Sequence, residues 1–213
     1  KISQLADNLG YDSLWATDFI NPVPQMGLPE GKHPNWYEVL VTLAFLAGHT
    51  DRIHLGAGMV LLPYRDPVIL AKQVTTLDQL SGGRFLFGWG MGAFRDEFRS
   101  IQSKKKKINR GEVLDENMEA LHLLLNSKGK VSFTGDHYEF NDVDLHPKSI
   151  QQPLPIYISG HSPKTNERIA KYATGMSVAF SYLNNSYREI LDPLLPYLDK
   201  EGRDISEIDR QFS

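Results

Sequence analysis

Glycines lie near the C-terminal ends of three predicted strands, at positions where a bound molecule could approach the backbone. Gly58, Gly90 and Gly160 each lie near the end of such a strand. In a parallel α/β fold these ends meet at one face, where ligands bind. Glycine has no Cβ, which leaves room for a flat or phosphorylated group, and the N–H groups of a helix that starts at Ser162 could bind a phosphate. The alternative for each glycine is a simple turn.

Two titratable side chains also follow predicted strands. Asp18 comes after the first strand, and His161 comes directly after Gly160. Asp18 could orient a bound molecule, and its alternative is to cap a turn at the start of a proline-rich loop. His161 is the histidine that the sequence favours most for a role in binding, and its alternative is an ordinary surface position.

Composition excludes several classes of protein. Of the 213 residues, 41% are hydrophobic and 10% aromatic, which is enough for a folded core. The formal charge of 23 minus 26, or −3, lacks the basic excess of a nucleic-acid-binding protein. No run approaches the roughly 18 apolar residues of a membrane span, and residues 1–10 do not resemble a signal peptide. We therefore expect a cytoplasmic protein without nucleic-acid or membrane partners.

Metal-binding patterns are absent from the sequence. The chain has no cysteine, which excludes disulfides and cysteine-ligated metals. Its seven histidines form no HExxH motif and no close pair with the spacing of metal ligands. No protein-bound metal is therefore expected.

Strand-like and helix-like segments alternate along the chain. Short strands are predicted at 13–17, 53–62, 84–89, 155–159 and 176–181. Helices are predicted at 2–9, 36–47, 67–81 and 111–125, from 163 onward, and at 187–200, where Pro193 and Pro196 would bend the helix. Asn35 is the predicted N-cap of the second helix, and Trp36 begins its apolar face. Residues 18–34 contain four prolines and two glycines, which predicts a long loop.

This alternation predicts an α/β fold with a parallel sheet and helices outside it. We predict a (β/α)₈ TIM-like barrel that is incomplete in this chain, because a complete one has about 250 residues. Its first strand would precede residue 1, and its last two would follow residue 213. Residues 1–213 would then form a single partial barrel domain, with an insertion at about 127–149 that holds a hairpin at 131–140.

Several ordered segments resemble the bacterial luciferase-like monooxygenase family. They extend from residue 9 to about residue 180 and keep the family's order and spacing. The segments are LGYDSLWATD at 9–18, RIHLG at 52–56, RDP at 65–67, LDQLSGGRF at 77–85, GWGMG at 88–92, DEF at 96–98, RG at 110–111, DE at 115–116 and PLPIYISG at 153–160.

The resemblance implies a TIM-like barrel that binds FMN or, in a sister branch, a deazaflavin coenzyme at the C-terminal ends of its strands. It implies a strand bulge against the isoalloxazine ring at Gly58 and Met59, often with a cis peptide bond. It also implies that the backbone at 90–92 lies near the cofactor and that 159–162 is the phosphate-binding turn. The cofactor-binding residues carried over in this way are Gly58, Met59, Gly90, Met91, Ser159, Gly160, His161 and Ser162.

Two positions depart from the family's pattern. Phe19 follows Asp18 where family members often have a histidine near the reacting carbon. This difference disfavours a deazaflavin-dependent dehydrogenase and predicts that Phe19 is an apolar wall of the substrate pocket. Met91 stands where the luciferase catalytic subunit has an arginine toward the cofactor phosphate, so phosphate binding would be weaker or come from elsewhere.

The resemblance therefore predicts a flavin-dependent monooxygenase that uses reduced FMN and oxygen on a small organic substrate. Asp18 is the candidate catalytic residue. A flavin reductase and a second copy of the chain, in a homodimer, are the expected protein partners. The alternatives are a deazaflavin-dependent hydride-transfer oxidoreductase and a non-catalytic accessory subunit, since a fold alone does not guarantee activity.

Overall fold

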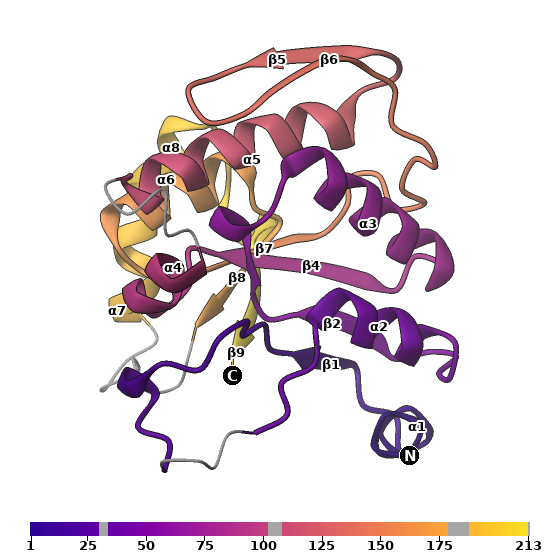
Figure 1. Ribbon diagram of the computed structural model, residues 1–213. Coiled ribbons are helices and arrows are strands. Elements are labelled where there is room, and N and C mark those ends of the chain that lie inside the picture. Colours follow the sequence, from indigo (N-terminus) through magenta and orange to yellow (C-terminus); the bar gives the residue numbers. More distant parts are fainter. Residues whose placement is uncertain (30–33, 102–107, 179–187, 213) are drawn as a thin grey trace.

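The computed structural model describes residues 1–29, 34–101, 108–178 and 188–212. Its main feature is a parallel sheet with helices along its outer side (Figure 1). Within the described residues this sheet contains β1 (Ser13–Ala16), β2 (His54–Ala57), β3 (Val60–Leu61), β4 (Phe85–Gly90), β7 (Ile156–Ser159), β8 (Gly175–Val178) and β9 (Asp209–Phe212). The strand order is β1-β2-β4-β7-β8-β9, and β3 pairs with β4.

Helices follow most of these strands, as a barrel of repeated strand–helix units requires. The α-helices are α1 (Ile2–Asn8), α2 (Val39–Ala47), α3 (Pro67–Leu80), α4 (Arg95–Ile101), α5 (Arg110–Asn126), α6 (Pro163–Tyr172), α7 (Arg188–Leu191) and α8 (Leu195–Lys200). Short 3₁₀ helices lie at Pro24–Met26, Leu62–Tyr64, Asp192–Leu194 and Ile205–Glu207. The core lies between the sheet and the inner faces of α2, α3, α5 and α6.

The sheet curls strongly toward its inner face. β2 and β4 separate β1 from β7, so in a flat sheet β1 and β7 would lie roughly 14 Å apart. The ring centroids of Trp15 in β1 and Tyr157 in β7 are nevertheless 5.1 Å apart. Trp15 lies directly over Gly56, where a Cβ would come within 2.2 Å of its ring. The predicted α/β fold is therefore confirmed as a partial barrel of parallel strands.

A separate hairpin lies outside the barrel, over α5 (Figure 1). β5 (Val131–Thr134) pairs antiparallel with β6 (Glu139–Val143), which confirms the predicted hairpin and extends it to Val143. That residues 127–149 are an insertion in a single domain stays a prediction.

Some elements differ from the expectation. The N-cap of α2 is Glu38, whose carboxylate accepts the Val41 N–H at 2.7 Å, so the prediction of Asn35 was wrong. Trp36 lies in the preceding loop instead of on the helix. The helical segment predicted at 187–200 is interrupted at Pro193, as expected, by a 3₁₀ turn between α7 and α8, whereas Pro196 lies inside α8; residue 187 lies outside the described residues.

Two further elements were not predicted at all. They are α4, which is rich in charged residues, and β9, which is largely polar. Of the strand predicted at 176–181, residues 179–181 lie outside the described part of the chain. Among the described helices, none is both long and apolar enough to cross a bilayer. A cytoplasmic location stays a prediction.

Candidate functional site

The C-terminal ends of β1, β3, β4 and β7 surround a cleft of about 460 Å³. The sequence predicted that the candidate residues would converge there, and this is confirmed, although their roles stay predictions. The predicted residues that line the cleft are Asp18, Phe19, Gly58, Met59, Gly90, Met91, Ser159, Gly160, His161 and Ser162.

Gly58 and Met59 form the break between β2 and β3. The peptide bond that joins them is cis, as the resemblance implied. The Gly58 N–H donates to the Ala16 carbonyl at 2.8 Å, which ties the break to β1. The Met59 side chain lies against β4, where a Cβ at Gly90 would be 3.6 Å from Met59 Cβ. This segment therefore forms one wall of the cleft.

The N-terminus of α6 forms another wall. Ser162 is the N-cap, and its hydroxyl lies 3.2 Å from the Thr165 N and 2.9 Å from Thr165 Oγ1. Gly160 has a φ of +118°, and a Cβ there would lie 3.3 Å from Thr165 Oγ1. Only glycine adopts this conformation readily, and its lack of a side chain keeps the approach to the helix open. The partial positive charge of a helix N-terminus favours a bound anion.

Arg168 is a cleft residue that the sequence reading missed. It lines the cleft from the second turn of α6, and it is buried. Its Nε donates to an Asp115 carboxylate oxygen on α5. The spacing of Ser162, Thr165 and Arg168 could have indicated that Arg168 lies on the same side of the helix as the predicted phosphate-binding turn, because residues three apart share one helix face.

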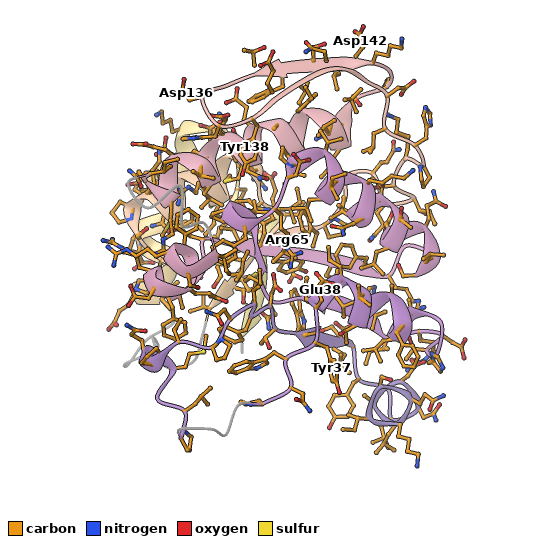
Figure 2. The ribbon with its side chains drawn as sticks, in the orientation of Figure 1. Tyr37, Glu38, Arg65, Asp136, Tyr138 and Asp142 are labelled. Carbon is orange, nitrogen blue, oxygen red and sulfur yellow. The ribbon has the colours of Figure 1, made fainter. Side chains whose placement is uncertain are left out.

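Asp18 joins the loop after β1 to the segment that follows β3. One carboxylate oxygen, Oδ2, accepts the Leu61 N–H at 3.0 Å and lies 2.6 Å from Arg65 Nη2. Arg65 also reaches Glu38, with Nη1 and Oε1 3.0 Å apart (Figure 2). The second oxygen, Oδ1, is buried and has no hydrogen-bond partner among the described residues. These bonds connect distant parts of the chain, so they are not a local turn cap.

Phe19 contributes an aromatic wall. Its ring centroid lies 4.8 Å from that of Trp36 and 6.4 Å from that of Phe94. Both neighbours belong to loops, one before α2 and one before α4. The position of Phe19 therefore depends on how these loops are held.

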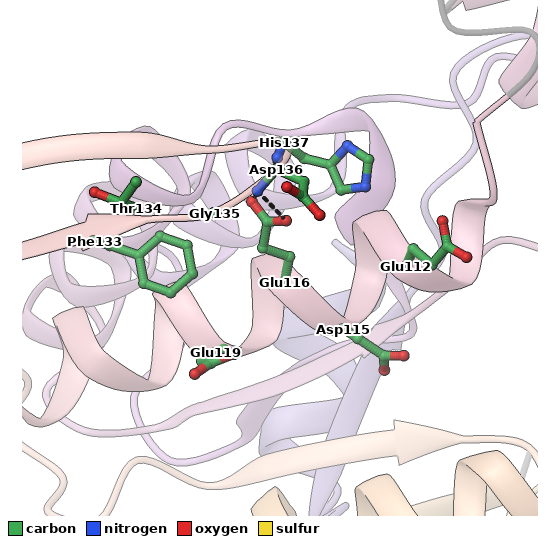
Figure 3. Close-up of a pocket in the computed structure, with 9 residues that line it drawn as sticks. All are labelled: Glu112, Asp115, Glu116, Glu119, Phe133, Thr134, Gly135, Asp136 and His137. Atoms are coloured by element: carbon green, nitrogen blue, oxygen red, sulfur yellow. Dashed lines mark hydrogen bonds between the residues drawn. The ribbon is translucent and has the colours of Figure 1, made fainter.

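An acidic hollow of about 470 Å³ lies elsewhere, between α5 and the hairpin (Figure 3). Glu116 points from α5 to the hairpin turn and accepts the backbone N–H groups of Asp136, His137 and Tyr138 at 2.7 to 2.9 Å. No group of three or more potential metal ligands is arranged around a common centre in the described ranges. We therefore assign Glu116 to the attachment of the hairpin.

Known proteins resemble the whole chain. A profile of luciferase-like monooxygenases matches residues 1–213. The alkanal monooxygenase alpha chain of the Kryptophanaron alfredi symbiont is 27% identical over 219 aligned residues, which cover 100% of this chain and 57% of that protein. The oxygenase component of a flavin-dependent trigonelline monooxygenase from Acinetobacter baylyi is 24% identical, over 99% of this chain and 55% of its own. The chain thus spans little more than half the length of these relatives.

Solved structures share the fold of this chain. A solved structure of an F420-dependent secondary alcohol dehydrogenase, in complex with an F420-acetone adduct, superimposes with a TM-score of 0.81. It is 20% identical, and the match covers 99% of this chain and 62% of that one, which shows a shared fold. The match of the family profile along the whole sequence shows more: the chain belongs to the luciferase-like monooxygenase family.

Proposed function

We propose that the protein is a flavin-dependent monooxygenase that uses reduced FMN and oxygen to oxidise a small organic substrate. The observation that carries this proposal is the convergence of glycine-bearing strand ends and the N-terminus of α6 on one cleft. The cleft volume of about 460 Å³ lies within the roughly 300–1,000 Å³ usual for small-molecule and cofactor sites. The names of the oxygenase relatives support the same reaction class.

The α6 end of the cleft fits a cofactor phosphate. Ser162 and Thr165 offer hydroxyl groups there, and Gly160 leaves the helix N-terminus accessible. Arg168 lines the same cleft and would supply the positive charge that Met91 lacks. Together with Ser159 and His161, these residues would hold the phosphate.

The other end of the cleft fits a flat ring and an apolar substrate. Gly58 and Met59 on one side and Gly90 and Met91 on the next strand would flank the ring. Reduced FMN, when bound, would supply the electrons that activate oxygen. The chain's own part is to orient the reactants and to exclude water from them. We assign the orientation of substrate or ring to Asp18, through Oδ1, which has no partner within the described part of the chain.

The second candidate is a deazaflavin-dependent hydride-transfer oxidoreductase. The shared fold with an F420-dependent dehydrogenase favours it, because F420 is a deazaflavin. Phe19 weighs against it, since a phenyl ring cannot exchange a proton with a reacting group. The monooxygenase therefore remains the preferred function.

Two protein partners belong to the proposal. A flavin reductase would deliver reduced FMN, in line with the "oxygenase component" in the name of the Acinetobacter relative. A second copy of the chain would cover the apolar outer side of α1 and α2, where Leu5, Val41 and Phe45 are 58%, 69% and 65% exposed.

Reconstitution of the full-length protein tests the proposal. Reduced FMN and reduced deazaflavin are supplied in parallel with oxygen and a panel of organic substrates that begins with alkanals. We expect oxygen-dependent product with FMN. Hydride transfer with the deazaflavin and no oxygenated product would instead establish the second candidate. Saturation by neither cofactor would favour a non-catalytic subunit.

A further inference from the structure

The loop after β1 is fastened to α4. Glu97 Oε1 accepts the backbone N–H of Ile20 at 2.8 Å and that of Asn21 at 3.2 Å. The Asn21 side chain donates to Ser100 Oγ at 2.9 Å, and the Gln25 side chain donates to Asp96. Four hydrogen bonds therefore join segments that are more than 70 positions apart in the sequence.

Glu97 is fully buried, which is unusual for a carboxylate on a short, charged helix. Its exposed fraction is 0%, and its second oxygen, Oε2, has no hydrogen-bond partner among the described residues. Burial of a carboxylate is costly unless hydrogen bonds compensate for the lost water. Burial and the nearby Glu97 carboxylate together raise the pKa of Tyr64, so its hydroxyl stays protonated beside Glu97. Such a costly placement indicates that the two bonds to the loop matter.

Phe19 lies between two anchored points of this loop. The residue before it, Asp18, is fixed to Leu61 and Arg65. The two residues after it are fixed to Glu97. Its ring neighbour Phe94 directly precedes α4. The loop and α4 therefore set the position of the Phe19 ring in the cleft.

We propose that Glu97 is a positioning residue, which holds Phe19 as an apolar wall and so selects a substrate with an apolar group at this end of the cleft. This inference rests on the proposed function of the cleft as the flavin and substrate site. Glu97 acts through the backbone of residues 20 and 21. It is not a group that touches the reacting atoms.

Amide hydrogen exchange of the full-length protein tests the positioning directly. We expect Glu97→Ala to speed exchange in peptides that contain Ile20 and Asn21 by about tenfold or more, because hydrogen bonds to a charged acceptor are lost. Glu97→Gln keeps an acceptor oxygen and is expected to restore most of the protection. Glu119→Ala, at an exposed carboxylate of α5, is the matched control and should leave exchange unchanged.

Equilibrium binding tests the selection of substrate without turnover. The probes are decanal, as an apolar chain, and FMN. Glu97→Ala is expected to weaken decanal binding by about tenfold while FMN affinity changes by less than about threefold, since only the Phe19 end of the cleft is disturbed. Phe19→Ala should weaken decanal binding to a similar extent.

The outcomes separate the two levels of the proposal. Failure of the wild-type protein to bind FMN would overturn the proposed function. Two results would overturn the inference alone, provided that FMN binds normally. One is unchanged amide exchange of the loop in Glu97→Ala, and the other is the absence of decanal binding by the wild type. If Glu97→Ala does not fold, Glu97→Gln and Phe19→Ala are used to test the inference instead. Unchanged decanal affinity in Phe19→Ala would contradict it.

Discussion

Arg168 Nε donates to Asp115 Oδ1 at 2.7 Å, which fixes the guanidinium of α6 against α5. The Arg168 side chain is only 9% exposed, whereas that of Asp115 is 40% exposed. The arginine is thus held in the wall of the cleft by a partner that lies nearer to solvent.

The first prediction concerns this arginine. Arg168→Met is expected to weaken FMN binding by about 10- to 100-fold, because a hydrogen bond to a charged group contributes roughly 1.5–3 kcal/mol. Anaerobic titration with reduced FMN measures the effect. Lys164→Met, at an exposed lysine on the same helix, is the control and should bind normally. Equal affinities in wild type and Arg168→Met would remove Arg168 from the site.

The second prediction concerns Gly160. Gly160→Ala is expected to cost about 1–3 kcal/mol of stability, because alanine adopts this backbone conformation poorly. It should also weaken FMN binding, since the new methyl group would lie against Thr165. Gly129→Ala is the control, as a Cβ there meets nothing within 4 Å. Thermal unfolding and FMN titration of both variants measure the difference, and a Gly160→Ala protein that behaves like Gly129→Ala would contradict the prediction.

The third prediction concerns the buried pair of Asp18 and Arg65. Arg65→Met is expected to lower the free energy of unfolding by about 3–5 kcal/mol, because it leaves the buried Asp18 carboxylate without its cation. Adding Asp18→Asn should recover part of this loss. Chemical denaturation of the two single variants and the double variant measures the coupling. Additive losses would show that the two side chains do not interact.

The fourth prediction concerns pH and Asp7. The backbone N–H of Asp51 lowers the pKa of the Asp7 carboxyl from its usual 3.8, with help from Ile53 and Arg52 and against the effect of burial. The folded state thus favours the carboxylate, and the stability this gives is present above pH 3.8 and is lost as pH falls through the folded pKa.

Asp7→Asn should therefore lower the melting temperature by a few degrees at pH 7. The difference from wild type should shrink as pH falls below 3.8 toward the lowered pKa of the folded state, because the wild-type carboxylate is protonated over that range. Thermal unfolding of wild type and Asp7→Asn from pH 7 down to pH 3 measures the difference in melting temperature and its change with pH. A difference that stays constant over this range would contradict the assignment.

Local patterns were enough to predict the elements around the cleft. The helix predicted at 67–81 is α3, which Asp66 caps by accepting the N–H groups of Val68 and Ile69. Ser162, where a helix was expected to start, caps α6. Glycines near strand ends were sufficient to place the cleft, because parallel strands end on one face.

Long-range bonds could not be predicted in the same way. The bonds from Arg168 to Asp115 and from Glu97 to Ile20 join different elements, and no local spacing reveals such partners. β9 was missed because the Asp209–Phe212 segment is largely polar and is stabilised by pairing with β8. In α1, Ile2 and Leu5 follow helical spacing, yet they are 81% and 58% exposed while Asp7 is buried by its bonds to the turn before β2.

The most direct test of the central claim compares FMN with riboflavin, which lacks the phosphate. Both are titrated in reduced form into the full-length protein and into Arg168→Met. If the cleft binds a flavin with its phosphate at α6, the wild type should prefer FMN by about 100-fold, because a charge-assisted phosphate contact is lost with riboflavin. Arg168→Met should lose most of that preference. Equal affinity of the wild type for the two flavins, or no binding of either, would contradict the claim.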